Sequence, residues 1–142
     1  MSAIATNPKI DRLRAVKFFT NASDRALENL GRSTDEITVP SGRTLISEGE
    51  FNLVAYIIED GEAEVLVGDE SVAVLGAGEM IGEVGFFLGG KATATVRAKT
   101  DLTVFALPYN RIDSLLDENP AMLRAIAEEL AERLQAMDAR QQ

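Results

Sequence analysis

The chain has 142 residues, with 14 Lys and Arg against 23 Asp and Glu and no His, Cys or Trp, so its formal net charge is −9. The lack of His and Cys excludes Ser-His-Asp and Cys-His catalysis as well as zinc sites of the Cys and His type. Because Lys and Arg are scattered through a strongly acidic chain, we expect no direct binding to nucleic acid.

The length and the N-terminal segment indicate a single soluble domain. A chain of this size buries about two-thirds of its unfolded surface in one core, so we treat residues 1–142 as one domain. The first residues, MSAIATNPKIDRLR, lack the apolar core of a signal peptide, and no run reaches the roughly 18 apolar residues of a membrane span. We therefore expect a cytoplasmic protein without a membrane partner.

Residues 1–34 are expected to be helical. Apolar residues at near-helical spacing predict a first helix from about Pro8 to Val16. Ser23 is a favourable N-cap for a second helix, and Gly31 is expected to end it. Both helices are short, so they need the rest of the domain to dock on.

From Ile37 onward, β-branched residues and turn signals at short intervals replace the helical pattern. Turns about every 8–12 residues are typical of antiparallel sandwiches, jelly rolls and barrels. We therefore expect residues 35–107 to form an antiparallel β structure. The predicted strands are Ile37–Val39, Thr44–Ser47, Val54–Ile58, Ala63–Val67, Ser71–Leu75, Thr93–Ala98 and Leu102–Leu107.

Residues 108–142 return to a helical pattern. A short helix is predicted over Pro108–Leu116, and a long one after Asn119, a favoured N-cap, with Pro120 at its first position. The long helix carries a narrow apolar stripe formed by Leu123, Ile126, Leu130, Leu134 and Met137. Two interpretations remain open: the stripe packs on the sheet, or it forms the seam between two subunits of a homodimer.

The segment Gly78–Ala98 is the most informative part of the chain. Residues Val84–Leu88 are expected to form one helical turn before two glycines, and the free backbone N–H groups at the start of such a turn attract an anion. Glu83 is unsuited to an anion and suits ligand hydroxyls instead. A pocket that offers N–H donors to a phosphate and a carboxylate to a neighbouring hydroxyl fits a nucleotide sugar, if the two converge.

Two catalytic interpretations of this segment fail. The run from Gly85 to Lys91 matches the start of a phosphate-binding loop, but Ala92 stands where Ser or Thr would hold magnesium, and a β-branched segment follows instead of a helix. Glu79 and Glu83 have the spacing of an acid–base pair, but no cleft residue accompanies them. We expect no catalytic residue and no metal site.

Several of these features together resemble the cyclic-nucleotide-binding domain family. The resemblance covers nearly the whole chain and rests on Phe18-Phe19 before the Ser23 helix, Gly49-Glu50, Tyr56-Ile57-Ile58 with Gly61, and Gly82-Glu83 through Thr95-Val96. It implies an α+β, mainly β fold: an antiparallel β jelly roll (double-stranded β-helix) with N-terminal helices and a long C-terminal helix. Residues 82–96 correspond to the family's phosphate-binding cassette.

The resemblance also implies roles for single residues. Within the turn that begins at Gly82, Glu83 would hold the ribose 2′-hydroxyl, and the backbone N–H groups around Val84 and Gly85 would face the cyclic phosphate. Thr93 would add a hydroxyl at the phosphate. The ligand would be cyclic AMP or cyclic GMP, with no other cofactor.

One departure from the family pattern affects affinity. The family's phosphate-binding Arg is replaced by Ala92, and only a one-residue shift would let Lys91 substitute for it. A hydrogen bond to a charged group contributes about 1.5–3 kcal/mol, so the loss weakens binding by about ten- to a hundredfold. Another small anionic or sugar-like ligand, or no ligand, remains an alternative.

The chain ends about where the family's C-terminal helix ends, so we expect a stand-alone, non-catalytic regulatory or sensor module. Ligand binding would move the long helix and change the affinity for a regulated partner protein whose identity the sequence does not reveal. The alternative is a degenerate, ligand-free dimeric protein-interaction scaffold of the same fold.

Overall fold

The structure is a computed structural model that describes the backbone of residues 8–16, 19 and 22–141, and the side chains of these residues except 8, 33, 83, 84, 129, 133 and 137–141. Of the two phenylalanines before the second helix, Phe19 is buried and Phe18 lies outside the described residues. None of the helices in the described part of the chain is long and apolar enough to cross a membrane.

The N-terminal segment contains α1 (Pro8–Arg14) and α2 (Asp24–Ser33). Ser23 caps α2 as predicted, because its Oγ accepts a hydrogen bond from the backbone N–H of Ala26 at 3.1 Å. The prediction that Gly31 ends this helix is wrong. The helix continues for two more residues, and the Gly31 carbonyl accepts a hydrogen bond from Lys9 Nζ of α1 at 3.1 Å.

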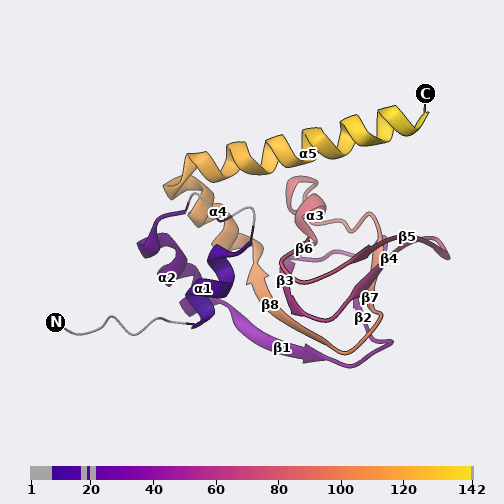
Figure 1. The fold of residues 1–142 in the computed structure, drawn as a ribbon, viewed down its shortest axis with the longest axis horizontal. Helices are drawn as coiled ribbons and strands as arrows, with labels where there is room; N and C mark the ends of the chain where they lie inside the picture. Colours follow the sequence, from indigo (N-terminus) through magenta and orange to yellow (C-terminus); the bar gives the residue numbers. More distant parts are fainter. Residues whose placement is uncertain (1–7, 17–18, 20–21, 142) are drawn as a thin grey trace.

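Two four-stranded antiparallel sheets form the body of the molecule (Figure 1). The first sheet has the order β1 (Asp35–Val39), β8 (Leu102–Pro108), β3 (Val54–Asp60) and β6 (Met80–Ile81). The second has the order β2 (Thr44–Ile46), β7 (Thr95–Ala98), β4 (Ala63–Val67) and β5 (Glu70–Leu75). The predicted fold class, an antiparallel β jelly roll with flanking helices, is confirmed.

The central strands of the first sheet, β3 and β8, carry buried residues on both faces, whereas the edge strand β1 is largely exposed. Ala55 and Ile57 of β3 pack into a cluster with α1, α2, α4 and α5, whereas Ile58 belongs to a second cluster between the two sheets. This alternation is the ordinary period of a strand, and it explains why β3 reads as an almost continuous apolar run. Phe105 and Val104 of β8 divide between the two clusters in the same way.

Near the cassette the predicted elements need two corrections. The two-residue strand β6, paired with β3 at Tyr56 and Ile57, was not predicted, because two apolar residues between turns carry no periodic signal. Thr93 and Ala94 precede β7 and are not part of it. The predicted helical turn is present as α3 (Glu83–Phe87), with Gly82 at its N-cap.

The C-terminal segment contains α4 (Tyr109–Glu118) and α5 (Pro120–Gln141). Pro120 occupies the first position of α5 as predicted. Asn119 plays a different part from the expected N-cap, because its Nδ2 donates back to the Leu115 carbonyl of α4 at 3.1 Å. Only one residue separates the two helices, and its side chain closes the first of them.

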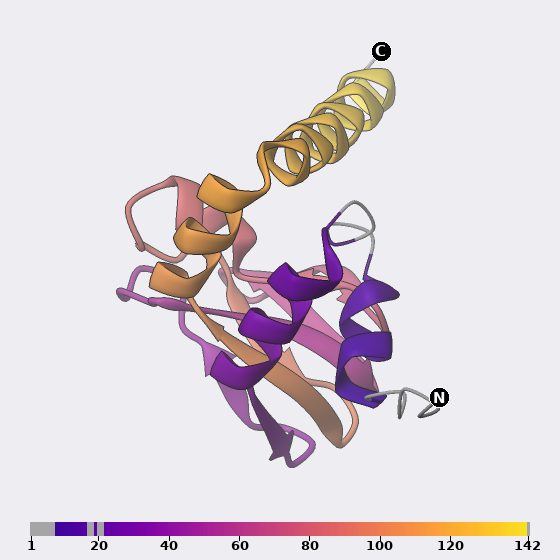
Figure 2. The ribbon, with the colours of Figure 1, turned by 90° about the vertical axis from the view of Figure 1, so that its left-hand side faces the viewer.

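The long helix leaves the body of the molecule along most of its length. It begins beside α4, passes α3 and extends toward the side where β4 and β5 lie (Figure 1), and Figure 2 shows it projecting away from the sheets. Met122 and Ile126 are buried in the helical cluster. Leu130, one turn further along, is partly buried against the same cluster, so the first half of α5 fixes its position and the remainder extends from that anchor.

Candidate functional site

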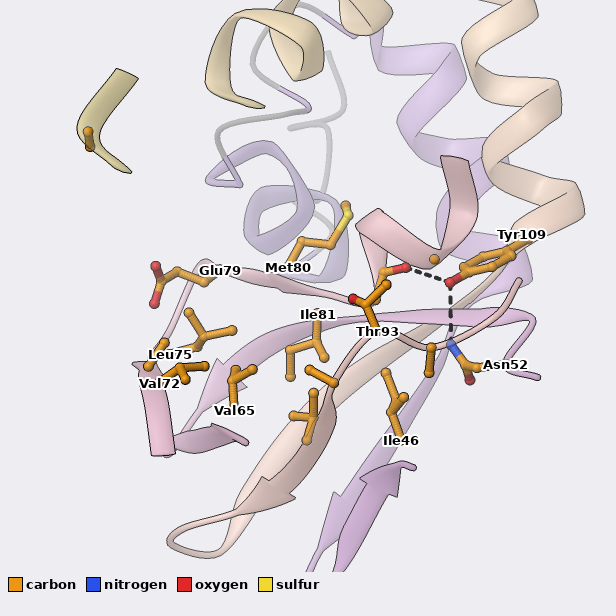
Figure 3. A pocket seen from close by; sticks show the side chains of 17 residues that line it. Ile46, Asn52, Val65, Val72, Leu75, Glu79, Met80, Ile81, Thr93 and Tyr109 are labelled. Carbon is orange, nitrogen blue, oxygen red and sulfur yellow. Dashed lines mark hydrogen bonds between the residues drawn. The ribbon is translucent and has the colours of Figure 1, made fainter. Parts of the chain in front are cut away.

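A pocket of about 490 Å³ lies on the second sheet, between the α3 turn and the distal part of α5 (Figure 3). Its volume falls within the range of small-molecule sites in proteins. The residues that line it are Ile46, Asn52, Val65, Val72, Ala73, Leu75, Glu79, Met80, Ile81, Gly82, Gly85, Ala92, Thr93, Ala94, Val96, Tyr109 and Ala136. Most of this lining is aliphatic.

The α3 turn is built on two glycines that no other residue replaces easily. Gly82 has a φ of +89°, in the left-handed region that favours glycine. A Cβ on Gly85 would lie only 2.9 Å from the Tyr109 hydroxyl oxygen. Both glycines line the pocket, so the backbone of this turn reaches the pocket wall directly.

Tyr109 pins the turn to the start of α4. Its hydroxyl donates to the Gly82 carbonyl, and its ring lies edge-on to Phe86 at 5.2 Å between centroids. Asn52 Nδ2 donates to the Val54 carbonyl at 2.6 Å and to the Tyr109 hydroxyl at 3.4 Å (Figure 3). Asn52 and Tyr109 are pocket residues that the sequence analysis missed. No local pattern marks them, because 57 residues separate the two.

The segment after α3 settles the question of register between Lys91 and Ala92. The Ala92 N–H donates to the Glu50 carbonyl at 3.0 Å, and its carbonyl accepts from the Gly49 N–H at 2.9 Å. With its backbone held on both sides, Ala92 directs its side chain into the pocket lining and is 8% exposed. Lys91 forms an isolated antiparallel β-bridge with Phe51, and its side chain is exposed. It is not among the lining residues, so the structure does not show the one-residue shift in register that would bring Lys91 into the pocket.

The other predicted cassette residues are placed as follows. Thr93 lines the pocket. Glu83 and Val84 begin α3, but their side chains lie outside the described part, so the role predicted for Glu83 at a ribose hydroxyl stays a prediction. With only five residues, α3 offers an anion little of the dipole that a longer helix provides.

The charged groups around the pocket are acidic or already paired. Among the described lining residues, Glu79 is the one with a charged side chain, and its Oε2 accepts from the Gly76 N–H at 2.6 Å. Arg97, which follows Thr95 on β7, binds Oε1 of Glu64 on β4 at 2.8 Å. This hydrogen bond lowers the pKa of the Glu64 carboxyl, and it engages the guanidinium away from the pocket lining.

The apolar stripe of α5 divides between two surroundings. Ile126 is buried and Leu130 is partly buried against the helical cluster, so the packing interpretation holds for these two residues. Leu123 and Leu134 are 46% and 63% exposed. The side chain of Met137 lies outside the described part. Ala136, one residue earlier, lines the pocket, so the distal part of α5 borders the candidate ligand site.

Comparisons with known proteins agree with this architecture. The family described as "Cyclic nucleotide-binding domain" matches residues 36–119. The cAMP-activated global transcriptional regulator CRP of Salmonella typhimurium is 37% identical over 102 residues, which cover 68% of this chain and 49% of that protein. The chain thus spans about half the length of the curated relatives that it matches first.

Two solved structures extend the comparison to the fold. The N-terminal domain of a transcriptional regulator from Streptomyces coelicolor is 28% identical, with a TM-score of 0.69 and coverage of 93% of this chain and 96% of that one. The sensor domain of the transcriptional regulator DNR from Pseudomonas aeruginosa is 21% identical, with a TM-score of 0.78 and coverage of 90% of both chains. The second likeness concerns the fold alone.

Proposed function

Because the chain belongs to the cyclic nucleotide-binding domain family, we propose that it is a non-catalytic regulatory module that binds a cyclic nucleotide, cyclic AMP or cyclic GMP, with reduced affinity. One observation carries the proposal. The pocket joins the α3 turn, through Gly82 and Gly85, to the distal part of α5, through Ala136. A ligand in this place contacts both elements at once.

Such a contact makes α5 the responding element. Its first two turns are anchored by Met122 and Ile126, whereas its distal part meets the body of the protein at the pocket. A ligand that binds more tightly when this part of α5 lies close shifts the helix toward that position, by no more than the difference in affinity. Whether the ligand strengthens or weakens the binding of a partner protein depends on which position of α5 that partner binds.

The reduced affinity follows from the side chain at position 92. Ala92 occupies the pocket wall where the family resemblance places an arginine, and Lys91 lies outside the lining. The Thr93 hydroxyl and the backbone of the α3 turn remain to bind a phosphate. A pocket of this volume favours ligand binding over the alternative of a ligand-free scaffold.

We also propose a homodimer that forms through α5. Leu123 and Leu134 are large apolar residues on this helix that the described part of the subunit leaves exposed. Their spacing of 11 residues, three helical turns, places them along one side of the helix. A second α5 would bury this side, and the signal of a bound ligand would then pass through the subunit contact.

Restoring the missing cation tests the function. Isothermal titration with cyclic AMP is expected to give weak binding to the wild type and about ten- to a hundredfold tighter binding to Ala92→Arg, since a hydrogen bond to a charged group contributes about 1.5–3 kcal/mol. Ala121→Arg, on the exposed first turn of α5, adds the same charge outside the pocket and serves as the control. Equal affinities for Ala92→Arg and the control would contradict the proposed ligand site.

A further inference from the structure

The pocket has two chemically different ends joined by an apolar wall (Figure 3). Thr93, Asn52 and Tyr109 lie together at one end, and Glu79 lies at the other, next to Leu75 and Val72. Between them the wall is formed by aliphatic side chains such as Ile46, Val65 and Ile81. The lining therefore separates an uncharged polar end from an acidic end.

The uncharged end offers hydrogen bonds without a countercharge. The Asn52 amide and the Tyr109 hydroxyl are engaged with each other and with backbone carbonyls, whereas the Thr93 hydroxyl forms no hydrogen bond with the described residues. A group that binds here can exchange a hydrogen bond with Thr93. A phosphate placed here would meet the Thr93 hydroxyl and the backbone of the α3 turn but no cation among the described lining residues, so its loss of water would be only partly compensated.

The acidic end is fixed in place. Oε2 of Glu79 accepts from the Gly76 N–H at 2.6 Å, which orients the carboxylate within the β5–β6 turn. Its Oε1 forms no hydrogen bond with the described residues. The free oxygen suits a ligand N–H donor, such as an amino group on a ring, and the charge repels a ligand anion.

From these two ends we infer that the pocket prefers an uncharged nucleoside-type ligand, with a hydrogen-bond donor at Glu79 and an apolar ring system between the ends, over a cyclic nucleotide monoanion. The inference rests on the proposed function for the location of the ligand. It goes beyond that function in stating which ligand charge the pocket selects. The negative field of a chain with net charge −9 disfavours a ligand anion, as the carboxylate of Glu79 does.

Adenosine and cyclic AMP form a suitable pair of probes, because both carry the same amine-bearing base and only the second carries a phosphate. Titration calorimetry on the wild type should show adenosine binding at least as tightly as cyclic AMP. Glu79→Gln should raise the affinity for cyclic AMP by about two- to fivefold, the size expected of an exposed charge pair, and should lower the affinity for adenosine. Glu62→Gln removes an equal charge from an exposed turn outside the pocket and should change neither affinity.

The outcomes separate this inference from the proposed function. Tenfold or tighter binding of cyclic AMP over adenosine by the wild type would overturn the preference and leave the cyclic nucleotide function standing. Equal responses of the Glu79→Gln and Glu62→Gln variants would overturn the role of Glu79. Binding of neither probe, with Ala92→Arg equally inactive toward cyclic AMP, would overturn the inference and the proposed function together.

Discussion

Glu59 on β3 has a largely buried side chain, and burial disfavours the ionised form of its carboxyl. Its side chain is 13% exposed, and its Oε2 is buried without a hydrogen-bond partner among the described residues. Arg12 of α1 contacts its other oxygen, and the carboxylates of Glu36 on β1 and Asp60 on β3 lie nearby. Burial and then the proximity of Glu36 raise the pKa of Glu59, and the charge of Arg12 offsets this only in part.

A raised pKa in the folded state makes the stability depend on pH. The raised pKa means that the protonated Glu59 carboxyl stabilises the folded state. This contribution to the unfolding free energy is fully present below the unfolded-state pKa of about 4.3 and is lost as the pH rises through the raised folded-state pKa. The unfolding free energy of the wild type, measured by denaturant titration from about pH 4 to pH 7, should therefore fall relative to that of Glu59→Gln. Glu62→Gln, at an exposed position, is the control. This explanation is wrong if the difference in unfolding free energy between the wild type and Glu59→Gln stays constant over this pH range, or if the wild type becomes more stable relative to the variant as the pH rises.

Residue-scale predictions from sequence succeeded where the reason was local. Ser23 could be recognised as a helix cap, since the cap and the N–H that it binds are three residues apart. Gly31 was misread as a helix end, because the helix around it is held by distant contacts, such as the hydrogen bond from Lys9, 22 positions away, to the Gly31 carbonyl. The placement of Ala92 in the pocket and of Lys91 outside it depends on a backbone pairing with residues 49–50, which no local pattern reveals.

At the scale of elements, α5 combines an anchored start with an exposed apolar side. The periodicity of its stripe predicted the helix, and the structure divides that stripe between buried Ile126 and exposed Leu123 and Leu134. Sequence could not make this division, because it depends on which turns of α5 reach the buried cluster formed with the other helices and the first sheet. The strand β6 and the exact start of β7 were likewise beyond the sequence, since both depend on pairing across the sheets.

The exposed side of α5 leads to a prediction about assembly. Leu134→Glu should convert a dimer into a monomer in analytical ultracentrifugation, because a charge at the centre of an apolar seam would be buried without a partner. The substitution should cost the isolated subunit little, since Leu134 is 63% exposed. Gln135→Glu, at the next exposed position, introduces the same charge and should leave the mass unchanged. A mass unaffected by Leu134→Glu would exclude this side of α5 as the dimer contact.

At the scale of the whole molecule, the two clusters of buried side chains have separate purposes. One lies between the sheets and shapes the floor of the pocket through Ile46, Ile81 and Val96. The other joins the helices to the first sheet and anchors the start of α5. Turn spacing and strand composition predicted an antiparallel sandwich, jelly roll or barrel, and the family resemblance selected the jelly roll among them. The pocket was predictable only in part, because residues from eight separate elements and their connections converge on it.

The proposed ligand site lies between a floor of buried side chains and a helix that is anchored at its start. A ligand in the pocket should therefore act on the distal part of α5. Ala136 places the distal part of α5 at the pocket, and the buried side chain of Ile126 holds the start of the helix in position.

Hydrogen exchange measured by mass spectrometry on the full chain, with and without saturating adenosine or cyclic AMP, tests this claim most directly. We expect slower exchange of backbone amides in the cassette, residues 82–96, and in the distal part of α5 around residues 130–136, with no change in α2. Protection confined to the cassette, with α5 exchanging at the same rate in both states, would show that the ligand does not act on the helix.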